Sequence, residues 1–165
     1  MQGKTEVVNP RLRDVVVALG SNQGDRQTHL EYAISALETH LTDMRVSPLI
    51  DTVAEEVGQQ PDFLNGVAVG LADLSPEKVM NILLEIERER GRIRPYAGAP
   101  RTLDLDLILV GSCVCDNDSV QLPHPRFRQR RFVLEPLVAI APTLVDPITG
   151  STMAELLSIL TGEAR

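Results

Sequence analysis

Apolar residues in this sequence alternate between two spacings, and the order of those spacings limits the fold. Short β-branched or alternating runs predict strands at 14–19, 44–53, 63–71 and 103–110. Apolar residues recur at helical spacing in two segments, 26–41 and 75–91. The order β, α, β, β, α, β is the signature of a ferredoxin-like α+β sandwich, in which helices cover a mainly antiparallel sheet.

Length limits the number of domains. With 165 residues, the chain can bury one good hydrophobic core but is short for two. We expect a flexible N-terminal leader at residues 1–13 and a single domain at 14–165. Segments 132–140 and 152–160 predict short helices, which would be extra C-terminal elements of that domain.

Composition argues against several classes of protein. No apolar run approaches the roughly 18 to 20 residues of a membrane span, and the polar N-terminus lacks the apolar stretch of a signal peptide. We therefore expect a cytoplasmic protein without a membrane partner. The formal net charge of −7 argues against nucleic-acid binding, which depends on a positive surface. Nothing in the sequence demands an oligomer, so we expect a monomer.

Arginine is concentrated in one part of this acidic chain. Arginine binds phosphate oxygens bidentately and keeps its charge when partly dehydrated, so the cluster favours a compact polyanionic ligand. The alternative is that these charges are solvated on a helix end and a loop. Nine of the 16 basic residues form the cluster, namely Arg88, Arg90, Arg92, Arg94, Arg101, Arg126, Arg128, Arg130 and Arg131.

Two aspartates alternate with leucines in the strand expected at 103–110. Side chains two apart share a face of a strand, so Asp104 and Asp106 project side by side while Leu105 points into the core. Adjacent carboxylates repel each other, and a hard divalent cation such as Mg²⁺ relieves that repulsion. The alternative is the solvent side of an edge strand. Carboxylates for a metal ion beside several guanidinium groups for phosphate oxygens predict phosphoryl transfer. This combination is more specific than either feature alone.

Several short motifs together resemble one known family. The resemblance covers about Val15 to Leu160 and is to the 6-hydroxymethyl-7,8-dihydropterin pyrophosphokinases of folate biosynthesis. It rests on P-R-T-L-D-L-D-L-I-L at 100–109, G-R-I-R at 91–94, L-G-S-N at 19–22, Q-P-D-F-L-N at 60–65, and Pro123-His124 spaced to Arg130 and Phe132.

The resemblance implies an ATP-dependent diphosphotransferase. Such an enzyme moves pyrophosphate from ATP to the hydroxymethyl group of the pterin, giving AMP and the pterin diphosphate. Asp104 and Asp106 would bind two Mg²⁺ ions that bridge the ATP phosphates. Together with Arg92 and Arg101, these aspartates would be the catalytic residues. The ATP site implied by the family consists of Glu87, Arg92, Arg94, Arg101, Leu107, His124 and Arg130.

The pterin site is also implied by the resemblance. Phe63 and Phe132 would stack on the two faces of the ring, while Asn65 and groups near Thr52 would read its polar edge. A flat heterocycle with polar edges needs aromatic faces and an amide that both donates and accepts hydrogen bonds. Core packing remains an alternative for each phenylalanine, and a structural turn remains one for His124.

Two other functions remain open from the sequence. The first is a ferredoxin-like module that binds a nucleotide or metal without turnover, which would bind ATP but release no AMP. The second is an RNA-binding domain of similar topology. Net charge opposes the second, and the strand-borne aromatic motifs of such domains are missing from the sequence.

Overall fold

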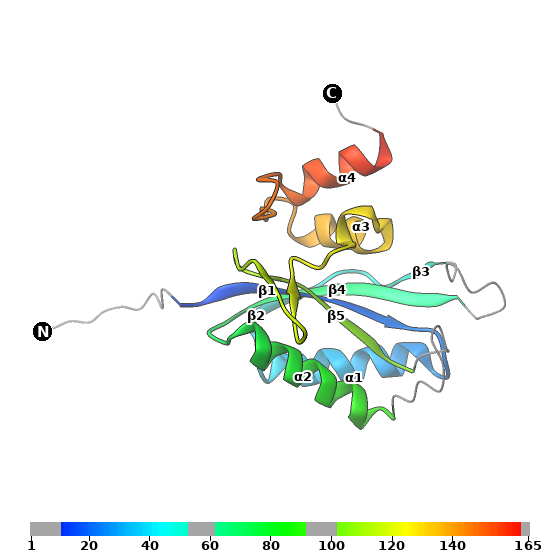
Figure 1. Ribbon diagram of the computed structural model, residues 1–165. Coiled ribbons are helices and arrows are strands. Elements are labelled where there is room, and N and C mark those ends of the chain that lie inside the picture. The colour runs from blue at the N-terminus through cyan, green and yellow to red at the C-terminus, as the bar shows by residue number, and fades with distance from the viewer. Residues whose placement is uncertain (1–10, 53–61, 92–101, 163–165) are drawn as a thin grey trace, which may run out of the picture.

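The computed structural model describes residues 11–52, 62–91 and 102–162 (Figure 1). The first seven elements are β1 (Arg13–Ser21), α1 (Arg26–Glu38), β2 (Thr42–Val46), β3 (Ile50–Thr52), β4 (Phe63–Ala72), α2 (Pro76–Glu89) and β5 (Asp104–Val110). They are followed by β6 (Cys115–Asp116), β7 (Gln121–Leu122), the 3-10 helix η1 (Phe127–Gln129), α3 (Arg131–Ile140) and α4 (Met153–Thr161).

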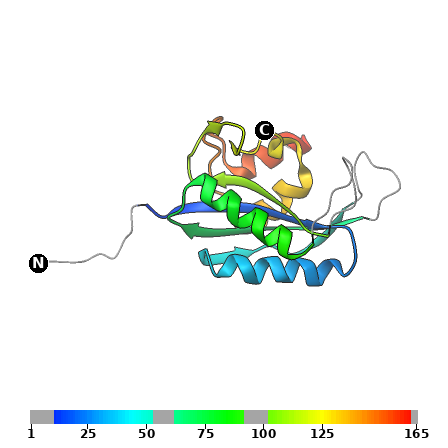
Figure 2. The same cartoon turned by 60° about the horizontal axis from the view of Figure 1, so that its bottom comes forward.

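The main sheet is antiparallel and is covered on both faces. Its order is β2-β4-β1-β5, and β3 also pairs with β4. Helices α1 and α2 lie on one face, and α3 and α4 lie on the other (Figures 1 and 2). The expected antiparallel sheet with helices is therefore confirmed, as are the two additional C-terminal helices. Among the described residues, no helix is both long and apolar enough to cross a membrane.

Alternate residues of the central strands enter two different cores. On β1, Val17 and Leu19 belong to the core beneath α1 and α2, whereas Val16 and Ala18 belong to the core beneath α3 and α4. This alternation follows from the two-residue period of a strand, and it decides the direction of every side chain at the strand ends.

Local capping explains where the first two helices begin. The Asp25 carboxylate caps α1 by accepting from the Thr28 N–H. The Ser75 hydroxyl caps α2 by accepting from the Lys78 N–H, as the Ser-Pro-Glu sequence predicts. Beyond α2, Gly91 has a φ of +72°, a conformation that favours glycine at a helix end.

Several predicted boundaries differ from those of the structure. The strand expected at 44–53 is divided into β2 and β3, because Pro48 carries no N–H for a sheet hydrogen bond. Arg13 was expected in the leader but is the first residue of β1, where it pairs with Ala72. Its guanidinium donates to the Leu74 carbonyl at 2.8 Å, which fixes the start of the strand. Residues 1–10 lie outside the described residues.

Candidate active site

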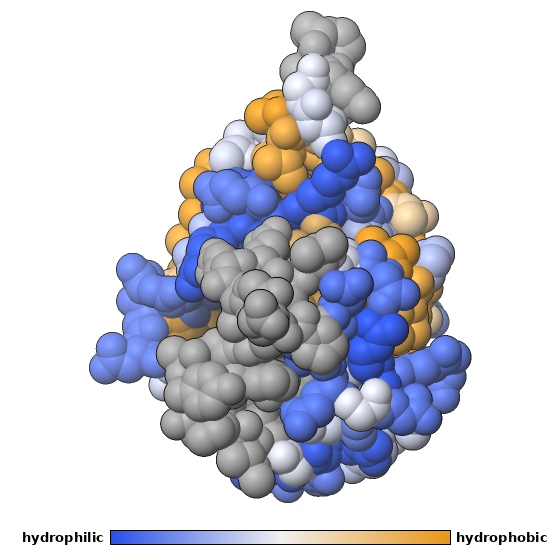
Figure 3. Space-filling view, turned by 90° about the vertical axis from the view of Figure 1, so that its right-hand side faces the viewer, coloured by the Kyte–Doolittle hydropathy of each residue, from blue (hydrophilic) through white to orange (hydrophobic). Residues whose placement is uncertain are grey.

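Three strands meet at one end of the sheet, where β1 ends and β4 and β5 begin. Gly20 on β1 pairs with Asn65 on β4 and with Asp104 on β5. Because paired antiparallel residues are about 5 Å apart, Asn65 and Asp104 lie about 10 Å apart with the glycine between them. Figure 3 views the molecule from this end, where hydrophilic residues cover much of the described surface.

Gly20 keeps the space between the two outer strands open. A Cβ atom at this position would lie 3.0 Å from the Asn65 Oδ1 and 3.5 Å from a ring carbon of Phe63. A larger side chain would therefore displace the amide of Asn65. Because Gly20 has no side chain, a flat molecule can lie against its backbone, between Asn65 and the carboxylates of β5.

The two aspartates point toward the layer of α3 and α4. Leu105 and Leu107 enter the core on the opposite face, as the alternation predicts. The Arg130 guanidinium reaches Asp106, with Nη1 3.5 Å from Oδ2, and the two side chains are 24% and 34% exposed. An ion pair so open to water contributes at most about 1 kcal/mol, so a phosphate group could exchange with the carboxylate as the partner of Arg130.

His124 lies beside this carboxylate and guanidinium group. Its backbone N–H donates to the Ile108 carbonyl at 3.0 Å, and its Nδ1 accepts from the Arg126 N–H at 3.1 Å. Burial, followed by the nearby charges of Arg130 and Arg126, lowers the pKa of His124 from 6.5 to about 4. The ring is therefore neutral at pH 7. Since Nδ1 accepts, this network assigns the proton to Nε2, where it can be donated to a ligand.

A titration of the histidines tests this assignment. We expect NMR to give a His124 midpoint near 4 in the free protein, assigned by its loss in His124→Gln. Because the folded state disfavours the charged ring, the contribution of His124 to stability is full above the unfolded pKa of 6.5. It is lost as the pH falls from 6.5 toward 4. A midpoint near 6.5 would show that the ring is neither buried nor next to the arginines.

Glu87 supports the strand that carries the aspartates. Its side chain is 2% exposed, and its Oε2 accepts the Leu105 N–H at 2.7 Å. Leu105 lies between the two aspartates on β5, which is the edge strand of the sheet formed by the described residues. On an edge strand, the N–H groups of the outer side need acceptors from outside the sheet. Glu87 therefore holds the backbone at the centre of the Asp-Leu-Asp sequence. Its expected role at the edge of the ATP site stays a prediction.

The residues expected to bind the pterin come from two layers. Asn65 is 7% exposed and donates its amide N–H to the Thr52 hydroxyl, while Phe63 pairs with Thr52 across β3 and β4. Phe63 and Asn65 share the face of β4 that carries Val67, on the side of α3 and α4. Phe132 lies in the first turn of α3 and packs partly against the same core. Both phenylalanines therefore lie on one side of the sheet.

The structure does not place the other expected site residues beside these side chains. Leu107 is buried in the core beneath α1 and α2, so its expected contact with adenine stays a prediction. Arg92, Arg94 and Arg101 lie outside the described residues.

The arginine cluster is divided by its partners. Arg88 pairs with Glu85 and Arg131 with Glu135 on exposed helix surfaces, so solvated charge is the better description of both. Sequence spacings of three and four residues favour such pairs on a helix surface.

Arg90 occupies a different position, between α2 and α1. Its guanidinium contacts the His29 Nδ1 at 2.8 Å and lies 4.6 Å from the centre of the Tyr32 ring. No motif in the sequence indicates a role for His29 or Tyr32, because their approach to Arg90 depends on how the two helices pack. Arg90 ties the end of α2 to α1 directly before the chain enters the G-R-I-R motif.

Comparison with known proteins identifies the family. The model of the 7,8-dihydro-6-hydroxymethylpterin-pyrophosphokinase (HPPK) family matches residues 16–142. The chain belongs to this family. The matched range includes every described residue of the site, from Gly20 on β1 to Phe132 on α3.

Several proteins are similar to this member of the HPPK family. The 2-amino-4-hydroxy-6-hydroxymethyldihydropteridine pyrophosphokinases of Pseudomonas aeruginosa and Synechocystis are 39% and 40% identical to it. These matches cover 89% and 86% of this chain, and 91% and 73% of the respective relatives. The folic acid synthesis protein fol1 of Schizosaccharomyces pombe is 36% identical over 87% of the chain, which spans only 20% of that longer protein.

Solved structures of HPPK-DHPS from Plasmodium falciparum have a similar fold. One has a TM-score of 0.72 and 12% sequence identity, covering 92% of this chain and 45% of the other. At this identity the likeness concerns the fold alone. The arrangement of sheet and helices in this chain is therefore similar to that of the Plasmodium falciparum structure.

Proposed function

We propose that this chain transfers the pyrophosphoryl group of ATP to 6-hydroxymethyl-7,8-dihydropterin. The main support is that four polar side chains lie together on one side of Gly20 and Asn65 lies on the other. The four are Asp104, Asp106, His124 and Arg130. Carboxylates and cationic or N–H donors on one side suit a polyphosphate. An amide and aromatic rings on the other side suit a heterocycle.

The carboxylate pair fits two Mg²⁺ ions held jointly with the nucleotide. Within the described ranges, no three His, Cys, Asp or Glu side chains gather as a complete metal site. Magnesium does not need such a set, because it commonly binds one or two carboxylates and completes its shell with phosphate oxygens and water. Bound at Asp104 and Asp106, the ions would neutralise phosphate charge and orient the group that is transferred.

The side chains of this protein would position and stabilise the transferred group. Arg130 and the Nε2–H of His124 would donate to phosphate oxygens, in a site where neutral His124 adds a donor without adding charge. We assign Arg92 and Arg101 to the charge that develops on departing AMP, and Arg94 to the ATP site. These three assignments rest on the family motifs, and Glu87 and Leu107 are likewise assigned to the ATP site on that basis.

The acceptor would lie on the other side of Gly20. The Asn65 amide would read the polar edge of the pterin with the help of Thr52, and Phe63 and Phe132 would contact the ring faces. The hydroxymethyl oxygen then forms a bond to the β-phosphorus of ATP. The bond from that phosphorus to the bridging oxygen of AMP breaks, AMP keeps the electron pair, and the hydroxyl proton passes to water.

Incubation of the protein with ATP, Mg²⁺ and the dihydropterin tests the proposal. We expect AMP to form only when all three are present, as measured by chromatography against a control without pterin. Binding of ATP without AMP release would instead support the non-catalytic module.

Other predictions from the sequence accompany this proposal. The βαββαβ connectivity and the order β2-β4-β1-β5 support a ferredoxin-like topology. A single domain over 14–165, a monomeric state, a cytoplasmic location and the absence of nucleic-acid or membrane partners also stay predictions. Light scattering after size-exclusion chromatography measures the monomeric state.

A further inference from the structure

The segment from the end of β7 to the first turn of α3 carries three of the proposed site residues, His124, Arg130 and Phe132. Its centre is the short helix η1, whose burial depends on the Phe127 ring in the core beneath α3 and α4. Within the part of the chain that the structure describes, no side chain caps the start of η1 or of α3. The Arg130 N–H donates to the Phe127 carbonyl at 3.1 Å, so the position of Arg130 depends directly on the orientation of this turn.

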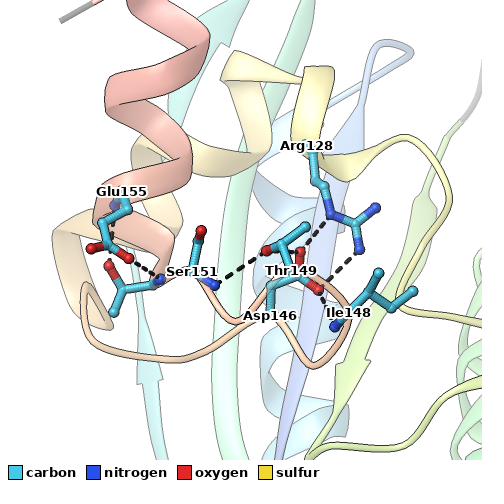
Figure 4. Close-up of polar contacts among 7 residues, drawn as sticks. Arg128, Asp146, Ile148, Thr149, Ser151 and Glu155 are labelled. Carbon is cyan, nitrogen blue, oxygen red and sulfur yellow. Dashed lines mark hydrogen bonds and ion pairs between the residues drawn. The ribbon is translucent and has the colours of Figure 1, made fainter. Parts of the chain in front are cut away.

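Arg128 attaches this turn to the loop between α3 and α4. Its Nε lies 2.6 Å from the Asp146 Oδ2 and its Nη2 lies 2.9 Å from the Oδ1, a bidentate pair between residues 18 apart in sequence (Figure 4). The guanidinium also lies 4.8 Å from the centre of the Phe127 ring. The side chain of Arg128 thus joins the buried ring, the turn and the loop.

Asp146 is fully buried and held by its own loop. Besides Arg128, it accepts hydrogen bonds from the Thr149 hydroxyl at 2.7 Å and from the Ile148 N–H at 3.0 Å. Its backbone N–H donates to the Ser151 carbonyl at 2.8 Å, and its carbonyl accepts from the Gly150 N–H at 2.8 Å. Burial opposes ionisation, but the bonds from Arg128, Thr149 and Ile148 outweigh it and lower the pKa of Asp146 to about 2.

An ion pair whose carboxylate is fully buried and whose arginine is 23% exposed is a poor source of stability. The desolvation of both charges offsets much of their attraction, and an apolar pair of similar volume is often as stable or more so. What the bidentate geometry supplies is a fixed direction, since the planar guanidinium must lie in the plane of the carboxylate. The turn that carries Arg130 is therefore oriented by a charge pair that an apolar contact could not replace.

We propose that Arg128 is a positioning residue for the transfer reaction: by binding Asp146 it sets the orientation of η1 and thereby places Arg130 opposite Asp106. This inference rests on the proposed function. Arg128 itself touches neither carboxylate of the β5 pair in the described contacts. Its effect is exerted through the backbone of residues 128–130.

Steady-state kinetics of three variants test the inference. Arg128→Met leaves a buried carboxylate with fewer partners, and we expect a KM for ATP raised on the order of tenfold and a lower thermal midpoint. Arg128→Lys can make one of the two bonds and should recover part of the loss. Arg128→Met combined with Asp146→Leu removes both charges, so it should recover the thermal midpoint while the KM for ATP stays raised.

The double variant separates positioning from stability. If KM returned to the wild-type value together with the thermal midpoint, Arg128 would have only a structural role and the inference would be overturned. Arg131→Met is the matched control, because Arg131 is an exposed arginine of the same segment that pairs with Glu135. We expect it to change KM for ATP little, and a rise equal to that of Arg128→Met would also overturn the inference.

Two further readouts do not depend on turnover. Calorimetry with Mg²⁺ and ATP should give a weaker Kd for Arg128→Met, and hydrogen exchange should be faster at the amides of 127–134 in the free variant. If the wild type made no AMP, the proposed function would fail on its own. The role of Arg128 would then be tested by the Kd for ATP and by hydrogen exchange. If Arg128→Met changed neither quantity, the positioning role would be overturned.

Discussion

Replacement of Asp106 by alanine is expected to lower AMP formation by at least about a thousandfold while the fold is kept. The variant loses one of the two carboxylates that would hold the metal ions. It also leaves Arg130 without the counter-charge 3.5 Å away. The cost in stability should be at most about 1 kcal/mol, because the pair is partly open to water and the side chain leaves no cavity in either core.

Measurement of this effect requires turnover, metal dependence and folding on the same sample. Initial rates of AMP formation over a range of Mg²⁺ concentrations should stay low, while circular dichroism and the thermal midpoint resemble the wild type. Asp73→Ala is the matched control, because Asp73 is an exposed aspartate in the loop between β4 and α2. Turnover near that of the wild type in Asp106→Ala would exclude this carboxylate from the metal site.

Replacement of Asn65 by leucine is expected to lower kcat/KM for the pterin by on the order of a hundredfold or more. Leucine is close to asparagine in shape, so it should preserve packing at this buried position beside Gly20. It cannot donate or accept a hydrogen bond, and the polar edge of the ring would then be buried without a partner. ATP should still bind, because Asn65 is about 10 Å from Asp104 across two strand spacings.

The two substrates must be measured separately to test this prediction. Calorimetry with Mg²⁺ and ATP should give a Kd close to that of the wild type, while kinetics with varied pterin show the loss. Gln27→Leu is the control, because it makes the same kind of change on the exposed surface of α1. A loss of ATP binding as large as the loss of pterin use would mean that Asn65 serves the fold rather than the acceptor.

Features set by local spacing could be predicted from the sequence. The shared face of Asp104 and Asp106 follows from the two-residue period of a strand, whatever the rest of the sheet does. The start of α2 at Ser75 and Pro76 follows from local hydrogen bonding. The order of strands and helices could likewise be predicted, because both central strands are long, largely apolar runs.

Features set by packing between distant segments could not be predicted. The bond from the Leu105 N–H to Glu87 joins residues on an edge strand and on the helix beneath it. The pairing of Arg128 with Asp146 depends on how a loop folds back over η1. No periodicity or motif reports such distances, because many partners are equally compatible with the sequence of each segment.

The role of Gly20 lies between these two cases. The first strand was expected to end at residue 19, but β1 continues through Gly20 to Ser21. Its pairing with both Asn65 and Asp104 depends on the register of three strands. Register is fixed by the packing of both faces of the sheet. The sequence therefore indicated the other residues of the site, but not the position of Gly20 between Asn65 and Asp104.

The most direct test of pyrophosphoryl transfer follows two labels on ATP through the complete reaction. One sample contains ATP labelled at the α-phosphate, the other ATP labelled at the γ-phosphate, and the products are separated by chromatography. We predict the γ label on the pterin product and the α label in AMP, because attack at the β-phosphorus moves both outer phosphates together. An α label on the pterin product, or a γ label released as free phosphate, would contradict this account.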